Sequence, residues 1–254
     1  MYRGPNLCPE GDPFLMNQEF NSARNVSLEL DETGIVRQLL HTQAPFISQG
    51  RTPQLAAAEY LHQFGDLLGL TSDQLKNLSQ TPSSTVEDAP VEYRFLQEKH
   101  QFDTATVAYY QTDLGLPVWQ AGVAVQMKLN PFRVISAQST RHPDLNVTPP
   151  SRDAVKRTAS LNEEELARLL GLENQSKTRS NWDRASLKIE GHRLVIYRYE
   201  SAKRVPEVPP ARGEVDRQEH SSFTQALPTL PLPPVATAIR EGQHYVCAKI
   251  DFAL

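Results

Sequence analysis

The chain has 254 residues, a length sufficient for one large domain or two of about 120 residues each. Its net charge is −4 and 39% of its residues are hydrophobic. Its pI near 6.0 argues against a protein that binds nucleic acid over its whole surface, because such proteins carry a basic excess. No stretch approaches the ~18 apolar residues of a membrane-spanning helix, and the first residues lack the apolar segment of a secretory signal.

The first quarter of the chain predicts an arm, a hairpin and a helix. Residues 1–24 are polar and turn-rich without periodicity, which is typical of an N-terminal arm. Alternating residues at 26–30 and 35–39 flank a turn at 31–34 and predict a β-hairpin. Thr52-Pro53 is a helix start, and apolar residues at spacings of three and four predict an amphipathic helix that ends at Gly69 or at the Leu70-Thr71 junction. A capping box, Thr71 to Gln74, predicts a second short helix with Leu75 and Leu78 inward.

A hairpin at 105–127 is the central feature of the sequence. Strand-forming residues run on both sides of a turn at 113–117, where glycine and proline interrupt the pattern. The spacing predicts one apolar face that includes Trp119 and the alternate residues up to Met127, with Trp119 as a core anchor. A strand at 91–96, a turn at 97–103 and a strand at 133–139 complete a predicted four-stranded meander.

The second half follows a similar plan after Pro149-Pro150. Ser151 and Asn162 are positioned to cap two helices, the second with leucines on its inner side. A hairpin is predicted from strands at 187–189 and 194–199 with a turn at 190–192, and a last strand at 243–252. Between them, residues 205–236 contain seven prolines and predict an extended, mobile insertion.

Together these elements predict an α+β fold in which helices cover antiparallel sheets. The expected division is an arm at 1–24, a helix-plus-sheet domain at 25–148 and a second one at 149–254, which carries the irregular insertion 205–236.

No motif of a known catalytic or cofactor site occurs in the sequence. There is no HExxH, CxxC, GxSxG, phosphate-binding loop or GxGxxG, so no catalytic, cofactor-binding or metal-binding residue is predicted. Glu163, Glu164 and Glu165 fit the first turn of a helix, where acidic residues face the positive end of the dipole. The two cysteines, Cys8 and Cys247, could form one disulfide or remain as two free thiols.

A basic stretch at 177–204 marks the second half. Tyrosines alternate with an arginine on its last predicted strand, an arrangement found in sheet surfaces that bind RNA. The negative total charge favours instead a solvated or partner-facing strand surface. The residues predicted for a partner contact are Arg193, Tyr197, Arg198 and Tyr199.

The central hairpin resembles the fungalysin/thermolysin propeptide (FTP) domain. That family has a strand ending in Gln, a Gly-x-Pro-Val turn, an aromatic residue, a small residue and an apolar strand. The matching residues here are Gln111, Gly115, Pro117, Val118, Trp119 and Gly122, followed by Val123–Val125. The helix at 57–70 also looks like the helix in zymogens of secreted zinc proteases, and the second half is similar to a PepSY module.

The resemblance implies a two-part α+β propeptide with cystatin-like halves, each a helix laid on a curved antiparallel sheet. It implies no enzyme activity, no cofactor and a secreted setting. Such a module inhibits or chaperones a thermolysin-like zinc metallopeptidase, in cis after the C-terminus or in trans. The alternative is a stand-alone structural or protein-interaction domain with the same fold, and a weaker third hypothesis is a hydrolase whose site is scattered through the chain.

Overall fold

The computed structural model describes residues 17–21, 23–169, 188–204 and 235–253. They form a mixed α/β fold in which β-sheet predominates, with three α-helices in these ranges. The chain divides into two compact units, Met1–Leu145 and Asn146–Leu254. None of the helices in the described ranges is long and apolar enough to cross a membrane. Most of the predicted insertion at 205–236 lies outside the described residues.

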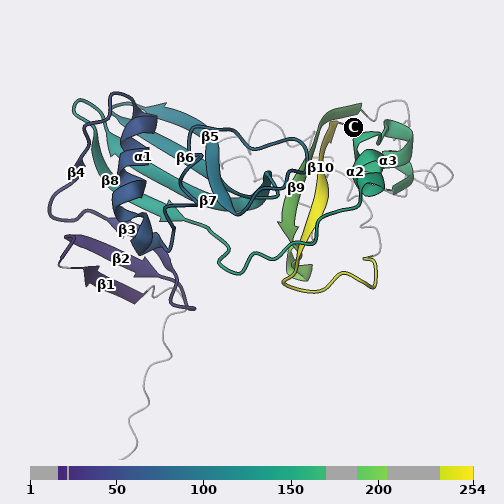
Figure 1. Ribbon diagram of the computed structural model, residues 1–254, viewed down its shortest axis with the longest axis horizontal. Coiled ribbons are helices and arrows are strands. Elements are labelled where there is room, and N and C mark those ends of the chain that lie inside the picture. The colour runs from purple at the N-terminus through teal and green to yellow at the C-terminus, as the bar shows by residue number, and fades with distance from the viewer. Residues whose placement is uncertain (1–16, 22, 170–187, 205–234, 254) are drawn as a thin grey trace, which may run out of the picture. The chain divides into compact units, whose positions relative to one another are not determined.

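The first unit is built on an antiparallel sheet with the strand order β1-β2-β3-β8-β7-β6-β5 (Figure 1). Its long strands are β1 (Asn17–Asn21), β2 (Val26–Leu30), β3 (Val36–Leu40), β5 (Glu92–Gln101), β6 (Thr104–Asp113), β7 (Leu116–Lys128) and β8 (Arg133–Ser139). The two-residue strand β4 (Phe46–Ile47) pairs with the start of β8, while β3 pairs with the rest of it. Strand β1 lies inside the segment expected to be an arm.

Helix α1 (Pro53–Phe64) covers one face of this sheet (Figure 1). It begins as predicted, because the Thr52 hydroxyl accepts a hydrogen bond from the backbone N–H of Leu55 at 3.2 Å. Tyr60 and Leu61 are fully buried and face the apolar residues of the sheet. A 3₁₀ turn (Gly65–Leu68) continues the helix and ends at Gly69, whose φ of 70° is in the left-handed region.

The segment after this turn has the predicted capping box but no second helix. The N–H of Thr71 donates to Gln74 Oε1 at 3.0 Å, and the N–H of Gln74 donates to Thr71 Oγ1 at 3.4 Å. Residues 72–79 nevertheless form a series of turns, with Leu75 buried as expected. The carbonyl of Gln74 accepts a hydrogen bond from Tyr93 in β5 at 2.9 Å, so this segment is tied to the sheet edge.

The meander follows the prediction, except for its first turn. Strand β5 runs on to Gln101, where a turn was expected at 97–103, and only Phe102 and Asp103 connect it to β6. The register with β6 shifts between Phe95 and Gln97, and β5 remains paired with β6 on both sides of this shift. The pairing with β6 therefore continues through polar residues whose composition indicated a loop.

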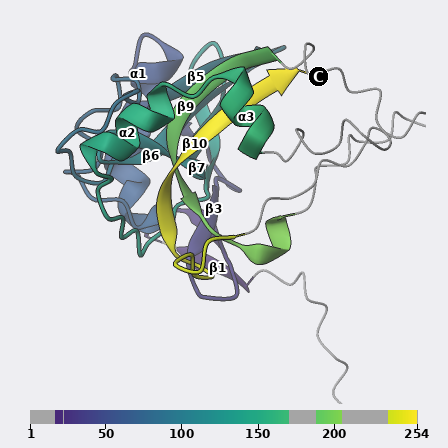
Figure 2. The same cartoon turned by 90° about the vertical axis from the view of Figure 1, so that its right-hand side faces the viewer.

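The second unit contains two short helices, α2 (Arg152–Ala159) and α3 (Glu163–Leu169), and a hairpin-like pair, β9 (Lys188–Arg198) and β10 (His244–Ala253). A 3₁₀ turn (Ser201–Lys203) follows β9. Figure 2 shows β9 and β10 as a curved ribbon with both helices beside it. Both predicted caps form: Ser151 Oγ accepts from the N–H of Ala154 at 3.2 Å, and Asn162 Oδ1 accepts from the N–H of Glu165 at 2.9 Å.

Packing in the second unit is sparse compared with the expected single helix on a sheet. Leu166 and Ala167 of α3 are buried and pack with Ile189 and Ile250 of the ribbon. The predicted turn at 190–192 is wrong, because β9 is continuous and Gly191 pairs with Asp251 of β10. The sequence suggested local pairing of 187–189 with 194–199, whereas the partner strand is β10, about fifty residues further along the chain.

Candidate functional site

The residues that carry the propeptide resemblance lie around the bend between β6 and β7. Among them, Gln111 binds the backbone of His142, near the end of the first unit. Gln111 is 2% exposed. Its Nε2 donates to the carbonyl of His142 at 2.9 Å, and its Oε1 accepts from the N–H of His142 at 2.8 Å. The Gln111 amide thus satisfies both backbone groups of His142, 31 residues away, as a neighbouring strand would.

Leu114 and Gly115 form the turn, and both have positive φ values, 53° and 73° respectively. This is the backbone expected for a tight turn between twisted antiparallel strands. A Cβ atom on Gly115 would lie 2.6 Å from Glu87 Oε2, so the position needs glycine for its φ and for space. Pro117 and Val118 are buried directly after the turn, with Pro117 opposite Thr112.

Gly122 of β7 pairs with Tyr110 of β6. A Cβ atom there would be 2.1 Å from the carbonyl oxygen of Tyr109, which is backbone and cannot move aside cheaply. The N–H of Gly122 donates to Thr140 Oγ1 at 3.1 Å, and its carbonyl accepts from the N–H of Thr140 at 2.9 Å. The glycine of the motif therefore allows β6, β7 and the end of β8 to approach one another.

Trp119 does not have the predicted place in the core. It is only half-buried and is not a member of the core cluster beneath α1. The reason is local: Gln120 has a φ of 57°, and the register shifts between Tyr110 and Thr112. The alternation that was expected to run from Trp119 to Met127 is broken there, so only Val123, Val125 and Met127 reach that core.

The sheet face opposite α1 carries a shallow hollow of about 240 Å³. Neutral side chains of mixed size line it, including Gln120, which has a positive φ of 57°. The lining residues are Leu96, Ala108, Tyr109, Tyr110, Gln120, Ala121, Gly122, Val123, Ala124, Gln138 and Thr140. Every one of them is neutral at pH 7, and burial raises the pKa of Tyr109 beyond its ordinary value. Such a surface can bind by contact and hydrogen bonds but offers no acid–base pair in its own wall.

The predicted partner residues of the second unit lie on different faces of the ribbon. Arg198 pairs with His244, whereas Tyr197 pairs with Tyr245 and Arg193 with Lys249. Residues an odd number apart on a strand point to opposite faces, so Arg198 is separated from Tyr197 and Arg193. Tyr199 lies just beyond β9, and its N–H donates to the carbonyl of Gln243 at 2.9 Å.

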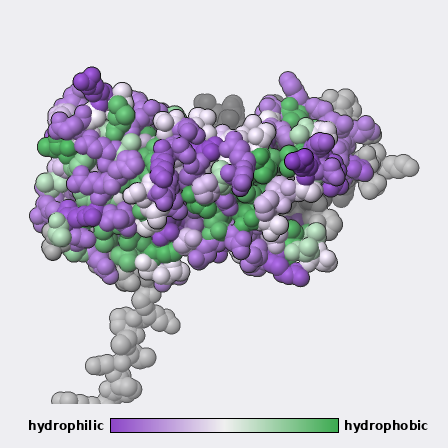
Figure 3. Space-filling model, in the orientation of Figure 1, coloured by the Kyte–Doolittle hydropathy of each residue, from purple (hydrophilic) through white to green (hydrophobic). Residues whose placement is uncertain are grey.

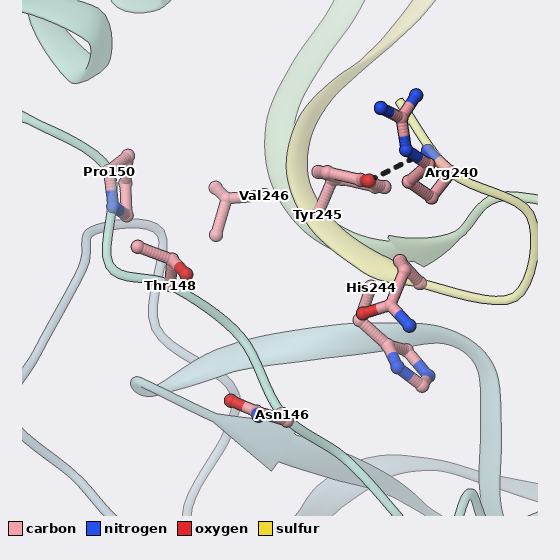
Figure 4. A pocket seen from close by; sticks show the side chains of 8 residues that line it. Asn146, Thr148, Pro150, Arg240, His244, Tyr245 and Val246 are labelled. Carbon is pink, nitrogen blue, oxygen red and sulfur yellow. Dashed lines mark hydrogen bonds between the residues drawn. The ribbon is translucent and has the colours of Figure 1, made fainter. Parts of the chain in front are cut away.

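A larger pocket of about 470 Å³ lies on the second unit at the start of β10. Figure 4 shows the segment 146–150 on one side of it and β10 on the other, with Pro150 facing Val246. The lining residues are Asn146, Thr148, Pro150, Arg240, Gln243, His244, Tyr245 and Val246. The Tyr245 hydroxyl accepts a hydrogen bond from the N–H of Arg240 at 2.9 Å, which fixes the turn that leads into β10. Sequence reasoning missed this pocket, because its two walls are about ninety residues apart.

Of the two cysteines, Cys247 lies in the described residues. Cys247 is a half-buried free thiol, and burial raises the pKa of that thiol, which keeps it protonated. Cys8 lies outside the described residues, so the structure bears on the predicted pair only through the free thiol of Cys247. Within the described ranges, no three His, Cys, Asp or Glu side chains come together in a group that could hold a metal ion.

The surface of the molecule is mostly hydrophilic on the face drawn in Figure 3, with apolar side chains interspersed. Among the described residues, the large apolar side chains that are exposed come from separate elements: Phe20, Ile47, Leu55, Phe102 and Leu169. Single exposed apolar residues of this kind are ordinary and do not mark a patch.

No protein-family model matches the sequence, and no curated protein matches it either.

Proposed function

We propose that the protein is a non-catalytic, propeptide-like module that binds a thermolysin-like zinc metallopeptidase and restrains or chaperones it. In this proposal the first unit is an FTP-like half and the second a PepSY-like half, both cystatin-like in plan. The observation that carries it is the bend between β6 and β7. Three residues that carry the resemblance lie there: Gln111 hydrogen-bonds the backbone of His142, and Gly115 and Gly122 occupy positions where a Cβ atom would clash.

The open face of the first unit's sheet is the proposed contact surface. Helix α1 occupies the other face, so the hollow is accessible from the side away from the helix. Its small side chains, such as Ala108 and Ala124, let a partner backbone approach, and Gln138 offers an exposed amide at its border. Binding by such a surface blocks a cleft through burial and needs no reacting group.

The test is inhibition of a purified thermolysin-like peptidase by the full chain, followed with a fluorogenic peptide. We expect loss of peptidase activity at micromolar protein. Gln138→Lys should weaken inhibition at least tenfold, because it buries a charge at the contact without a partner. Gln63→Lys is the matched control, since Gln63 is also exposed but lies on α1.

The outcomes separate the hypotheses. If the wild-type chain does not inhibit at micromolar concentration, the peptidase proposal fails and the stand-alone interaction domain is favoured. If it inhibits but Gln138→Lys and Gln63→Lys behave alike, the peptidase is the partner and the open sheet face is not the contact.

A further inference from the structure

Strand β5 is an edge strand of the first unit's sheet, and one stretch of its outer side is uncovered in the described ranges. The strand order ends at β5, which pairs with β6 on its inner side. On its outer side, the N–H of Tyr93 donates to the carbonyl of Gln74 at 2.9 Å. The N–H of Phe95 likewise donates to the carbonyl of Gln80 at 2.6 Å, and this cover ends there, where the register with β6 shifts. Residues 97–101 of β5, named here the open edge, lie beyond that cover.

The backbone of the open edge has hydrogen-bonding groups that point away from the sheet. The two-residue turn at 102–103 makes Gln101 and Thr104 a hydrogen-bonded pair, so every second residue back along β5 also bonds β6. Glu98 and His100 fall between these residues, and their N–H and C=O groups therefore face outward. Among the described residues, neither makes an outward backbone hydrogen bond. These donors and acceptors are available to an extended chain, as at other uncovered sheet edges.

Phe102 lies at the end of the open edge and is the most exposed large apolar residue in the described ranges, at 95%. It alone among those exposed apolar residues has a positive φ, 53°. Such a backbone costs a bulky residue roughly 1–2 kcal/mol in the free chain. The turn is nevertheless held, because Thr104 Oγ1 donates to the carbonyl of Gln101 at 2.7 Å. Strained residues and aromatic anchors are both enriched at binding surfaces, so Phe102 extends the open edge as a contact surface.

The charges of the open edge indicate which kind of chain fits it. Glu98 is already engaged, since its Oε1 lies 2.5 Å from His100 Nε2. Lys99 projects from the opposite face of the strand, is exposed, and has no ion-pair partner within the described residues. A second copy paired symmetrically about residue 99 would place Lys99 opposite Lys99, and like charges directly opposite are destabilising. A strand with an acidic residue at that place forms a cross-strand ion pair instead.

We propose that the open edge and Phe102 are a docking site for an extended segment of another protein, which adds to the sheet as an antiparallel strand. The outward N–H and C=O groups of Glu98 and His100 bond its backbone, an acidic residue of the segment pairs with Lys99, and an apolar one packs on Phe102. In this mode of recognition, main-chain hydrogen bonds supply affinity and side chains supply specificity. The site is distinct from the hollow on the open sheet face and does not depend on the peptidase proposal.

The test is titration of the full chain with the peptide acetyl-Leu-Thr-Val-Glu-Thr-Thr-amide, followed through backbone amide resonances. Its glutamate lies opposite Lys99 when its leucine meets Phe102. We expect saturable binding with a Kd of about 0.1–1 mM and slower hydrogen exchange at Glu98 and His100. Methylating the backbone nitrogen of the peptide's valine, which faces β5, should weaken binding about tenfold. Methylating that of its glutamate, which faces away from β5, is the matched control.

Two changes in the protein test the side-chain contacts. Lys99→Glu should weaken binding of this peptide about fivefold, and a peptide with lysine in place of the glutamate should restore it. Phe102→Asn should also weaken binding about fivefold, since it removes the aromatic contact. Phe20→Asn is its control, because Phe20 is an exposed phenylalanine on β1. Neither variant of the open edge removes a buried side chain, and thermal unfolding checks that both are folded.

Unsaturable binding, equal weakening by the two methylated peptides, or amide resonances of Glu98 and His100 that the peptide leaves unmoved would each overturn the proposal. Dimerisation of the chain that protects the same two amides without peptide would assign the open edge to a second copy and would overturn it as well.

Discussion

The two ends of strand β6 have turns with the same local strain and opposite surroundings. Phe102 at one end and Leu114 at the other have the same φ of 53°, a value that bulky residues rarely adopt. The Leu114-Gly115 turn is covered by the 83–89 segment, with hydrogen bonds of 2.8 Å from Ser83 to Gly115 and from Glu87 to Leu114. Phe102 is 95% exposed.

The contrast indicates that the turn between β6 and β7 is stabilised by contacts with the 83–89 segment rather than by the local conformational preference of its residues. At the Phe102 end, the neighbouring Asp103 provides the link to the sheet: its carbonyl accepts from the N–H of Leu129 at 2.8 Å, and its carboxylate lies 3.4 Å from Lys128. We expect mutations at the covered end to cost much stability and those at the exposed end to cost little.

The largest expected effect is at the buried ion pair beside the covered turn. Arg94 Nε donates to Glu92 Oε1 at 2.6 Å, and both side chains are less than 10% exposed. Arg94→Met would leave the Glu92 charge buried without its partner, which costs roughly 3–5 kcal/mol of unfolding free energy. Denaturant titration checks this. Lys128→Met, which removes the exposed pair at the other end, should leave the midpoint unchanged; equal losses would contradict the comparison.

Gly115→Ala should have the next largest effect. The substitution meets a φ of 73° and a Glu87 oxygen 2.6 Å from the new Cβ, and together these should cost about 1–3 kcal/mol. Gly34→Ala is the matched control, because Gly34 has a φ of 78° and no heavy atom within 4 Å of the added Cβ. A thermal-unfolding shift for Gly115→Ala that is no larger than the control's would show that Glu87 moves aside freely.

Acid should destabilise the covered end through Glu87. Hydrogen bonds from Ser83 and Arg94 lower the pKa of Glu87 below its ordinary 4.5, against the opposing effect of burial. The stabilisation is therefore complete above pH 4.5 and is lost as the pH falls through the lower folded-state pKa. Glu87→Gln should flatten the stability profile in that window. Asp103→Asn at the other end is the control; an unchanged profile in Glu87→Gln would count against the linkage.

The smallest expected effect is a gain at the exposed turn. Asparagine tolerates a positive φ better than phenylalanine, so Phe102→Asn should raise the unfolding free energy by about 0.5 kcal/mol. Phe20→Asn provides the comparison, because Phe20 is also exposed but lies in β1 without a positive φ. A loss of stability in Phe102→Asn would mean that the exposed ring contributes to the folded state.

Much of the first unit could be predicted from local signals. Thr52 and Pro53 identified the start of α1, and the turn at 31–34 and the alternation in β6 identified strands and their partners. These signals work because caps, tight turns and alternation depend on neighbours in sequence.

Long-range pairing and single irregular residues defeated the prediction elsewhere. Gly191 resembled a turn residue, yet β10 supplies the strand partner that keeps it extended. Gln120 has a left-handed backbone conformation, which turns Trp119 away from the predicted face. A glutamine in the sequence gives no sign of a positive φ. The β10 pocket joins 146–150 to 240–246, a juxtaposition that depends on tertiary structure alone.

The two hydrogen bonds between the Gln111 amide and the backbone of His142 have a mechanical consequence. His142 lies between the end of β8 and the end of the first unit at Leu145, and Gln111 fastens it to the inner strand β6 rather than to the edge of the sheet. Tension applied through residue 143 should therefore load the centre of the sheet in shear instead of peeling β8 away strand by strand. We expect a single high-force rupture when the unit is stretched between residues 17 and 143, and a lower one once Gln111→Ala removes the fastening.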